Sequence, residues 1–292
     1  MKRLFSTVYG VDTGPQTGAR NMEVDCMLME AFGDGRFYRR YGSGSCLWRF
    51  YGWQPHAVTL GYNQDSSAID TLRCAREGID IVRRPTGGRA VFHADEFTYS
   101  FFAETDEPNA VIYRLVHEVI RHALEALGID AEFCRSTLGE SSGKGAPVTC
   151  CTASARNELQ VDGRKLVGSA QRRTRRVLLQ HGSLPLTGKH KELSGLLAGG
   201  GREAAASTLR EMERKTVSLQ EVLGYIPRYG TLVGLMRDAF FRLNGFEMVM
   251  LERHELEGGV AAHVALHAVH ARVGADGVRL DLLGVHVVAH RG

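Results

Sequence analysis

The chain has 292 residues, of which 43% are hydrophobic and 24% charged, and its formal net charge is +3. This composition is that of an ordinary globular protein, and it excludes disorder, collagen-like repeats and a coiled coil. The net charge is too small to indicate nucleic acid or a membrane as a partner by itself.

The first residues and the cysteines bear on the compartment. The sequence has no apolar stretch long enough to span a membrane. Its beginning lacks the apolar core and cleavage site of a signal peptide. The six cysteines form no CxxC pair and no even disulfide framework. We therefore expect a protein of the reducing cytoplasm, with no membrane association.

Helical and strand patterns alternate over the first third of the chain. Apolar residues at helical spacing predict an amphipathic helix over 19–32, with Cys26 on its buried face. The β-rich run 56–62 predicts a strand, and a helix with a serine N-cap is expected over 66–78. A second strand, over 79–84, leads into a Pro-Thr-Gly-Gly turn.

The middle of the chain holds the clearest patterns. An apolar run over 90–102 predicts a strand, and the repeat of apolar residues at three and four over 109–127 predicts a helix. The Asp-Gly pair at 162–163 lies between two β-type runs within 158–171 and predicts a hairpin, with a further strand over 177–186. Because strands and helices mix without regular βαβ alternation, we expect an α+β, or mixed α/β, fold.

The C-terminal part divides into two pieces. A capping box over 218–221 predicts the start of a helical region. Near residue 258 the composition shifts to Gly, Ala, Val, His and Arg. We therefore expect one domain over 1–258 and an atypical tail of uncertain structure over 259–292.

Three histidines of that tail share one face if the segment is helical. His263, His267 and His270 fall at i, i+4 and i+7, a spacing that can bind a metal. The further ligands that such a site needs are missing nearby. We therefore expect no metal site.

The sequence RRPTGGRAVFH, residues 83–93, is the first segment with chemistry of its own. Two arginines end a strand, and paired glycines follow in a turn. Glycines let backbone N–H groups approach a ligand closely, and arginines neutralise a phosphate or carboxyl group. By itself the segment reads either as a plain hairpin turn or as a phosphate or acyl cradle.

Taken with its neighbours, this segment resembles one superfamily. RRPTGGRAVFHADEFTYSF, ELQVDGRKLVGSAQRR and LLQHGSLPL are similar to the successive motifs of lipoate-protein ligases, octanoyltransferases and, more distantly, biotin protein ligases. NMEVDCML, LGYNQ and SLQEVLG add to the resemblance, which spans residues 20–250. It is closest to the cysteine-dependent octanoyltransferase branch (LipM type). The resemblance implies that 1–258 is a catalytic domain of the biotin/lipoate protein ligase type, with a mixed β-sheet core flanked by helices.

The resemblance also implies an active site. Cys150 matches the nucleophilic cysteine of that branch, a residue suited to thioester exchange. Lys165 matches the lysine of the acyl site, where an ammonium can hold the acyl carbonyl and bias the thiol toward thiolate. The substrate-binding residues implied by the motifs are Arg84, Thr86, Gly87, Gly88, Arg89, His93, Gly168, Ser169, Ala170 and His181.

The two histidines of the matched motifs leave more than one role open. His181 could relay a proton, but a hydrogen bond that fixes the strand end is the favoured interpretation. Many relatives have Asp directly after the histidine matched by His93, whereas this chain has Ala94 and then Asp95. That departure weakens the case for a His-Asp couple.

The resulting hypothesis is an octanoyltransferase. The octanoyl group would pass from acyl carrier protein to a lysine of a lipoyl-type carrier domain, such as glycine cleavage H protein or a 2-oxoacid dehydrogenase E2, through a Cys150 acyl-enzyme. No cofactor is expected, because the step from thioester to amide is downhill. One alternative is a lipoate-protein ligase, which would need ATP and Mg and no cysteine. Another is a non-catalytic relative that binds a carrier domain or an acyl ligand.

A basic run follows Lys165. Six cations lie within residues 164–176 without an acid among them, four of them in 172–176. This run is either a solvated basic loop or a docking surface for acidic carrier domains. Because no aromatic residues interleave the cations, nucleic acid is not an expected partner.

Overall fold

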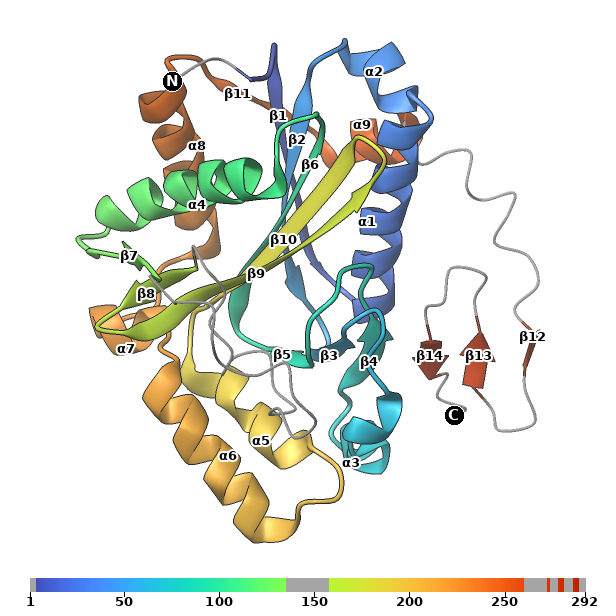
Figure 1. The fold of residues 1–292 in the computed structure, drawn as a ribbon, viewed down its shortest axis with the longest axis vertical. Helices are drawn as coiled ribbons and strands as arrows, with labels where there is room; N and C mark the ends of the chain where they lie inside the picture. Colours follow the sequence, from blue (N-terminus) through green and yellow to red (C-terminus); the bar gives the residue numbers. More distant parts are fainter. Residues whose placement is uncertain (1–3, 135–157, 260–271, 274–277, 281–285, 289–292) are drawn as a thin grey trace.

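The computed structural model describes residues 4–134 and 158–259, with the short segments 272–273, 278–280 and 286–288 (Figure 1). Its centre is an eight-stranded mixed sheet in the order β11-β1-β2-β6-β10-β9-β8-β7. β1 pairs in parallel with β11 and β2, and the other neighbours are antiparallel. The strands are β1 (Val8–Gln16), β2 (Cys46–Trp53), β6 (Glu96–Glu104), β7 (Glu132–Phe133), β8 (Leu159–Val161), β9 (Arg164–Thr174), β10 (Val177–Pro185) and β11 (Met248–Leu251).

Two smaller sheets accompany it. One has the order β4-β3-β5, with β4 (Asp80–Arg83) parallel to β3 (Ala57–Leu60) and β5 (Val91–His93) antiparallel. The other joins β12 (Arg272–Val273), β13 (Val278–Leu280) and β14 (His286–Val288). The helices are α1 (Gly18–Gly33), α2 (Arg36–Tyr41), α3 (Thr71–Arg76), α4 (Asn109–Glu125), α5 (Leu193–Leu196), α6 (Gly201–Lys215), α7 (Leu219–Leu223), α8 (Tyr229–Asn244) and α9 (Arg253–Gly259), with 3-10 turns η1 (Ser66–Ala68) and η3 (Gly188–Glu192).

Helices cover both faces of the main sheet. α4 and α8 pack on one face through one continuous apolar cluster, and α1, α2 and α9 pack on the other (Figure 1). Every residue of β2 is therefore buried, as is every residue of β6 except its last. Side chains of a strand alternate between its two faces, so each of these strands serves two cores at once.

Most of the expected elements are present, and the fold class is confirmed as a mixed sheet flanked by helices. The helix expected over 109–127 is α4, and the hairpin expected within 158–171 is β8 and β9 around a turn at 162–163. Both turn residues have positive φ, which is what an Asp-Gly turn supplies. The capping box at Ser218 and Glu221 is also confirmed.

Two expectations from the first third of the chain are wrong in detail. The helix expected over 66–78 is split into η1 and α3, and their N-caps are Asp65 and Asp70 rather than a serine. The helix over 19–32 is α1, but Cys26 is only half-buried. The buried face of α1 is rotated relative to the expected one. It includes a charged residue, Asp25, which faces the sheet.

Within the part of the chain that the structure describes, no helix is long and apolar enough to cross a membrane.

The boundary proposed near residue 258 falls in the last turn of α9, which packs on the sheet. Leu256 is buried in the cluster of α1 and α2, and the Tyr41 hydroxyl donates to the Glu255 carbonyl. We expect a chain cut after Gly258 to unfold cooperatively with unchanged stability in urea. A cut after Leu251 removes Leu256 from the core and should lower the free energy of unfolding by about 1.5–3 kcal/mol. Equal losses in the two truncations would refute the boundary.

Candidate active site

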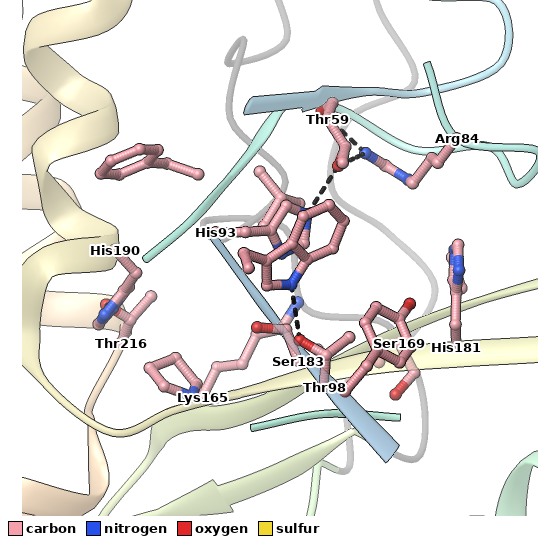
Figure 2. A pocket seen from close by; sticks show the side chains of 18 of the residues that line it. Thr59, Arg84, His93, Thr98, Lys165, Ser169, His181, Ser183, His190 and Thr216 are labelled. Carbon is pink, nitrogen blue, oxygen red and sulfur yellow. Dashed lines mark hydrogen bonds between the residues drawn. The ribbon is translucent and has the colours of Figure 1, made fainter. Parts of the chain in front are cut away.

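A pocket opens where the main sheet meets the smaller sheet of β3 and β5 (Figure 2). Atoms leave about 760 Å³ unfilled in and in front of this pocket, the open solvent at its mouth included. The surface of its wall is mostly apolar, although eleven of the twenty described residues on it carry a hydroxyl, imidazole or cationic group. The twenty residues are Met22, Tyr51, Trp53, Thr59, Arg84, Val91, Phe92, His93, Thr98, Lys165, Leu166, Gly168, Ser169, Ala170, His181, Gly182, Ser183, Pro185, His190 and Thr216.

A buried ionic network lies beneath this pocket. Arg49, Ser100 and His181 are register neighbours across β2, β6 and β10, and all three face Asp25 of α1. Arg49 Nη1 lies 2.7 Å from Asp25 Oδ1, and the Ser100 hydroxyl donates to Oδ2 at 2.8 Å. Burial alone would raise the pKa of Asp25, but the Arg49 charge and the hydrogen bonds from His181 and Ser100 outweigh it and hold the pKa below its ordinary value.

His181 connects that network to the glycine turn. Its Nδ1 lies 3.3 Å from Asp25 Oδ2, and its Nε2 lies 2.6 Å from the Thr86 hydroxyl. Burial lowers the pKa of His181, against the opposing hydrogen bond to Asp25, so the neutral ring is favoured. A carboxylate can only accept, so Nδ1 carries the proton and Thr86 donates to Nε2. Both ring nitrogens are therefore engaged, Nδ1 by Asp25 and Nε2 by Thr86.

A histidine–carboxylate couple does form in the pocket, with a residue that the sequence analysis did not consider. His93 Nδ1 lies 2.7 Å from Glu96 Oε1, and its Nε2 lies 2.8 Å from the Thr59 hydroxyl. Glu96 also accepts from the hydroxyls of Thr98 and Ser183. Burial would raise the pKa of Glu96, but the charge and hydrogen bond of His93, with the two hydroxyls, keep it below its ordinary value. Glu96 thereby orients three groups of the pocket wall.

Arg84 stabilises the glycine turn, because its guanidinium group donates hydrogen bonds to oxygens of the protein. It donates to the Thr59 hydroxyl and carbonyl (Figure 2), and also to the carbonyls of Gly87 and Arg89. A Cβ added at Gly61 would lie 1.9 Å from the Gly88 carbonyl oxygen, so the two loops touch through their backbones. Thr86, Gly87, Gly88 and Arg89 are not on the described wall of the pocket, and Thr86 contacts it through His181.

Lys165 is aimed into the pocket by an irregularity of β9. Gln160 pairs with Lys165 whereas Leu159 pairs with Val167, so β9 has one extra residue there, a β-bulge of the kind that redirects side chains. Lys165 consequently lies alongside Gly168, where an added Cβ would be 2.9 Å from Lys165 Cε. Its Nζ lies 2.7 Å from Glu158 Oε1, and both side chains are buried.

The remaining implied residues lie either on the pocket wall or outside the described part of the chain. Ser169 and Ala170 line the pocket, although the Ser169 hydroxyl is bonded to Tyr99 at 2.7 Å and to His117 at 2.9 Å from the α4 side. Cys150 lies outside the described residues, as do the three tail histidines. Among the described residues, no group of three or more potential metal ligands is found.

The basic run is less free than its sequence indicates, because carboxylates and backbone carbonyls from other segments bind its arginines. Arg173 donates to the carbonyls of Thr105 and Glu107 and to Asn109, and Arg176 lies 2.7 Å from Asp106. In the same run Arg172 donates to the Pro85 carbonyl and stacks over Tyr62, Arg164 lies 3.9 Å from Glu221, and Arg175 is exposed in the β9–β10 turn.

Sequence reasoning missed the carboxylates of this site and thirteen of the twenty described residues on its wall. Asp25, Glu96 and Glu158 lie within or next to the matched motifs, but acids are common on surfaces and their burial leaves no local signal. His190 and Thr216, which bond to each other at 2.8 Å, come from segments outside those motifs.

The fold and this pocket can now be compared with those of known protein families. A family model for the lipoyl protein ligase A/B catalytic domain matches residues 18–241, so the chain belongs to that family. The chain is 33% identical over 258 residues to octanoyltransferase LipM of Anoxybacillus flavithermus, covering 84% of this chain and 88% of that one. It is 34% identical over 248 residues to octanoyltransferase LipM of Moorella thermoacetica, covering 82% and 87%.

Solved structures agree on the fold. The bipartite lipoate protein ligase of Thermoplasma acidophilum, solved with its E2 lipoyl domain, superposes with a TM-score of 0.66 at 17% identity, covering 88% of this chain and 91% of that one. Lipoate-protein ligase A bound with ATP gives 0.62 at 18% identity, covering 88% and 94%. At these identities the likeness shows a shared fold, and it confirms the architecture expected from the motifs.

Buried neutral histidines should make the protein sensitive to mild acid. Burial lowers the pKa of both His181 and His190 below 6.5 in the folded protein, so the unfolded chain takes up protons first as the pH falls below 6.5. Stability is therefore present at pH 7.5 and lost toward pH 5.5, by up to about 1.4 kcal/mol for each histidine. Urea unfolding at the two pH values measures this loss.

His181→Gln tests one of the two contributions. This variant should lose less stability than the wild type between pH 7.5 and 5.5, because one of the two groups no longer titrates. His254→Gln, at an exposed position of α9, is the control and should follow the wild type. An unchanged pH dependence in His181→Gln would contradict the assignment of a neutral ring.

Proposed function

We propose that this protein transfers an octanoyl group from acyl carrier protein to a lysine of a lipoyl-type carrier domain, through a thioester on Cys150. It is an acyltransferase of protein lipoylation, a member of the family above and 31–34% identical to octanoyltransferases over most of their length. Lys165, whose largely covered side chain lies on the wall of this pocket in such a chain, is the observation that carries this conclusion.

The pocket suits the fatty chain and its carbonyl. Met22, Tyr51, Trp53 and Leu166 give it apolar walls, and burying each methylene of a fatty chain is worth about 0.8 kcal/mol. Lys165 supplies an N–H donor and a positive charge where an acyl oxygen becomes negative in the tetrahedral intermediate. We assign Lys165 to that role.

Comparison of the six cysteines leaves Cys150 and its neighbour as the candidates for the nucleophilic thiol. None of the four described cysteines lines the pocket, and Cys46 and Cys74 are buried. Burial raises the pKa of Cys46 well above its ordinary value and that of Cys74 to about 11, which disfavours the nucleophilic thiolate. Cys150 and its neighbour Cys151 are the other two cysteines, and Cys150 matches the motif.

The proposed reaction has two half-steps. The Cys150 sulfur attacks the thioester carbonyl carbon, the bond to the donor sulfur breaks, and the donor thiol leaves with a proton. The neutral amine of the acceptor lysine then attacks the acyl-cysteine. A C–N bond forms, the C–S bond breaks, and the proton lost by the amine restores the Cys150 thiol. The sum is a thioester and an amine converted to an amide and a thiol, so no ATP is needed.

The proposed partners are octanoyl acyl carrier protein as donor and, as acceptor, a lipoyl-type domain such as glycine cleavage H protein or a 2-oxoacid dehydrogenase E2. Arg175 follows Ala170 of the pocket wall by five residues along β9, about 16 Å at 3.3 Å per residue. A carrier domain seated at the pocket can therefore reach this exposed cation, and we narrow the docking surface to Arg172 and Arg175.

The acyl-enzyme gives a direct test. Mixing the protein with octanoyl acyl carrier protein alone should leave one octanoyl group on Cys150, seen by intact mass and removed by hydroxylamine. Cys150→Ala should abolish both the adduct and transfer to the acceptor, because no other cysteine stands at the matched position. Cys151→Ala is the matched control and should keep most activity.

One outcome of this test would replace the thioester mechanism by another. If Cys150→Ala still modifies the acceptor, and does so only with ATP, Mg and free octanoic acid, the protein is a ligase and the thioester route is refuted. If the wild type modifies no acceptor under either condition, it is a non-catalytic relative.

A docking surface at Arg175 predicts that the charge of this residue affects the rate of association with acyl carrier protein. Arg175→Glu should slow association with acyl carrier protein by roughly threefold or more at low salt, and the difference should shrink as salt screens the charges. Stopped-flow measurement of the association rate at several salt concentrations checks this. Arg202→Glu, an exposed cation at the start of α6, is the control and should have little effect. Equal slowing by both variants would contradict a docking surface at Arg175.

A further inference from the structure

We infer that Glu158 is a positioning residue for Lys165 in acyl transfer, a role that rests on the function proposed above. Glu158 Oε1 lies 2.7 Å from Lys165 Nζ, and the two side chains are 4% and 9% exposed. A pair this short and this buried is a charge-assisted hydrogen bond rather than a screened surface contact.

The backbone explains why these two groups meet. Gln160 and Lys165 are register partners in the β8–β9 hairpin, and Glu158 lies immediately before β8. Its carbonyl accepts from the Cys134 amide at 2.7 Å, which fixes its backbone beside β7. The bulge in β9 turns Lys165 toward this residue, and Gly168 leaves the space along which the lysine side chain lies. Lys165 is thus held within β9, and Glu158 is held next to β8 by its backbone hydrogen bond to Cys134.

The charges explain what Glu158 does. No Asp or Glu belongs to the described wall of the pocket, so Glu158 stands behind Lys165 and does not face the acyl group. A buried ammonium is costly without a counter-charge, and Glu158 supplies one. His190, also on the wall, adds no competing positive charge, because burial lowers its pKa.

Direction matters as well as charge. An ammonium has three N–H donors in fixed relative directions, so a bond to Glu158 sets where the other two point. Stabilising an oxyanion depends on donors already aimed at the place where charge develops. Glu158 therefore acts through Lys165, and its loss should reduce the rate of the chemical step more than substrate binding.

A double-mutant cycle tests this dependence. We expect Glu158→Gln to lower the single-turnover rate of octanoyl transfer at saturating donor by roughly tenfold to a hundredfold, with little change in KM, which is the scale on which residues that orient a reactive group act. Lys165→Ala should lower it by roughly a hundredfold to a thousandfold. The variant with both changes should match Lys165→Ala within about twofold, because Glu158 has nothing left to position.

Two further variants separate positioning from folding. Glu158→Asp keeps the charge one methylene further away and should recover part of the rate lost in Glu158→Gln. Glu221→Gln breaks the 2.6 Å pair with Lys191, whose side chain is about as buried as that of Lys165 but does not line the pocket. It should lose stability in urea yet keep the wild-type rate.

The outcomes distinguish this inference from the proposed function. A wild-type rate in Glu158→Gln, or a double variant slower than Lys165→Ala by the full factor of Glu158→Gln, would overturn the positioning role while octanoyl transfer itself stands. Absence of any octanoyl transfer by the wild-type protein would instead refute the proposed function.

Discussion

The buried ion pair of Asp25 and Arg49 is the constraint on which the rest of the site depends. Both side chains are completely buried, so neither charge can be left without the other, and removing one partner of such a pair costs about 3–5 kcal/mol. Asp25 ties α1 to β2, β6 and β10, and through His181 it also fixes Thr86 at the glycine turn. The helix, the sheet and the turn are thereby held at one point beneath the pocket.

Above that point, the polar groups of the pocket are mostly occupied by one another. His93 is held by Glu96 and Thr59, and His190 by Thr216, so these histidines serve the architecture of the wall. Lys165 differs, because its charge lies on the wall and its counter-ion lies behind it. A cavity with a mostly apolar surface and Lys165 on its wall is suited to binding a fatty chain and polarising its carbonyl.

The basic run shows how a tertiary arrangement changes the meaning of a charge pattern. The sequence places six cations together without an acid, but the fold brings Asp106 to Arg176 and backbone carbonyls to Arg173. These acceptors come from the segment between β6 and α4, about seventy residues earlier in the chain. Counting charges along the sequence therefore overestimated the positive charge that is exposed on the surface. Only part of the run is available to a partner.

Elements with strong local signals could be predicted from the sequence alone, such as α4 from its apolar spacing and the β8–β9 hairpin from Asp162-Gly163, and the motifs were enough to predict the family. The sequence could not determine which carboxylates are buried, because Asp25, Glu96 and Glu158 look like surface acids until residues distant in the chain cover them. The three-dimensional structure was needed to see that Glu96 bonds to His93, for which the sequence offered no adjacent aspartate, and that a bulge in β9 places Lys165 against Glu158. Burial and long-range hydrogen bonding depend on contacts between distant segments, and no local pattern records them.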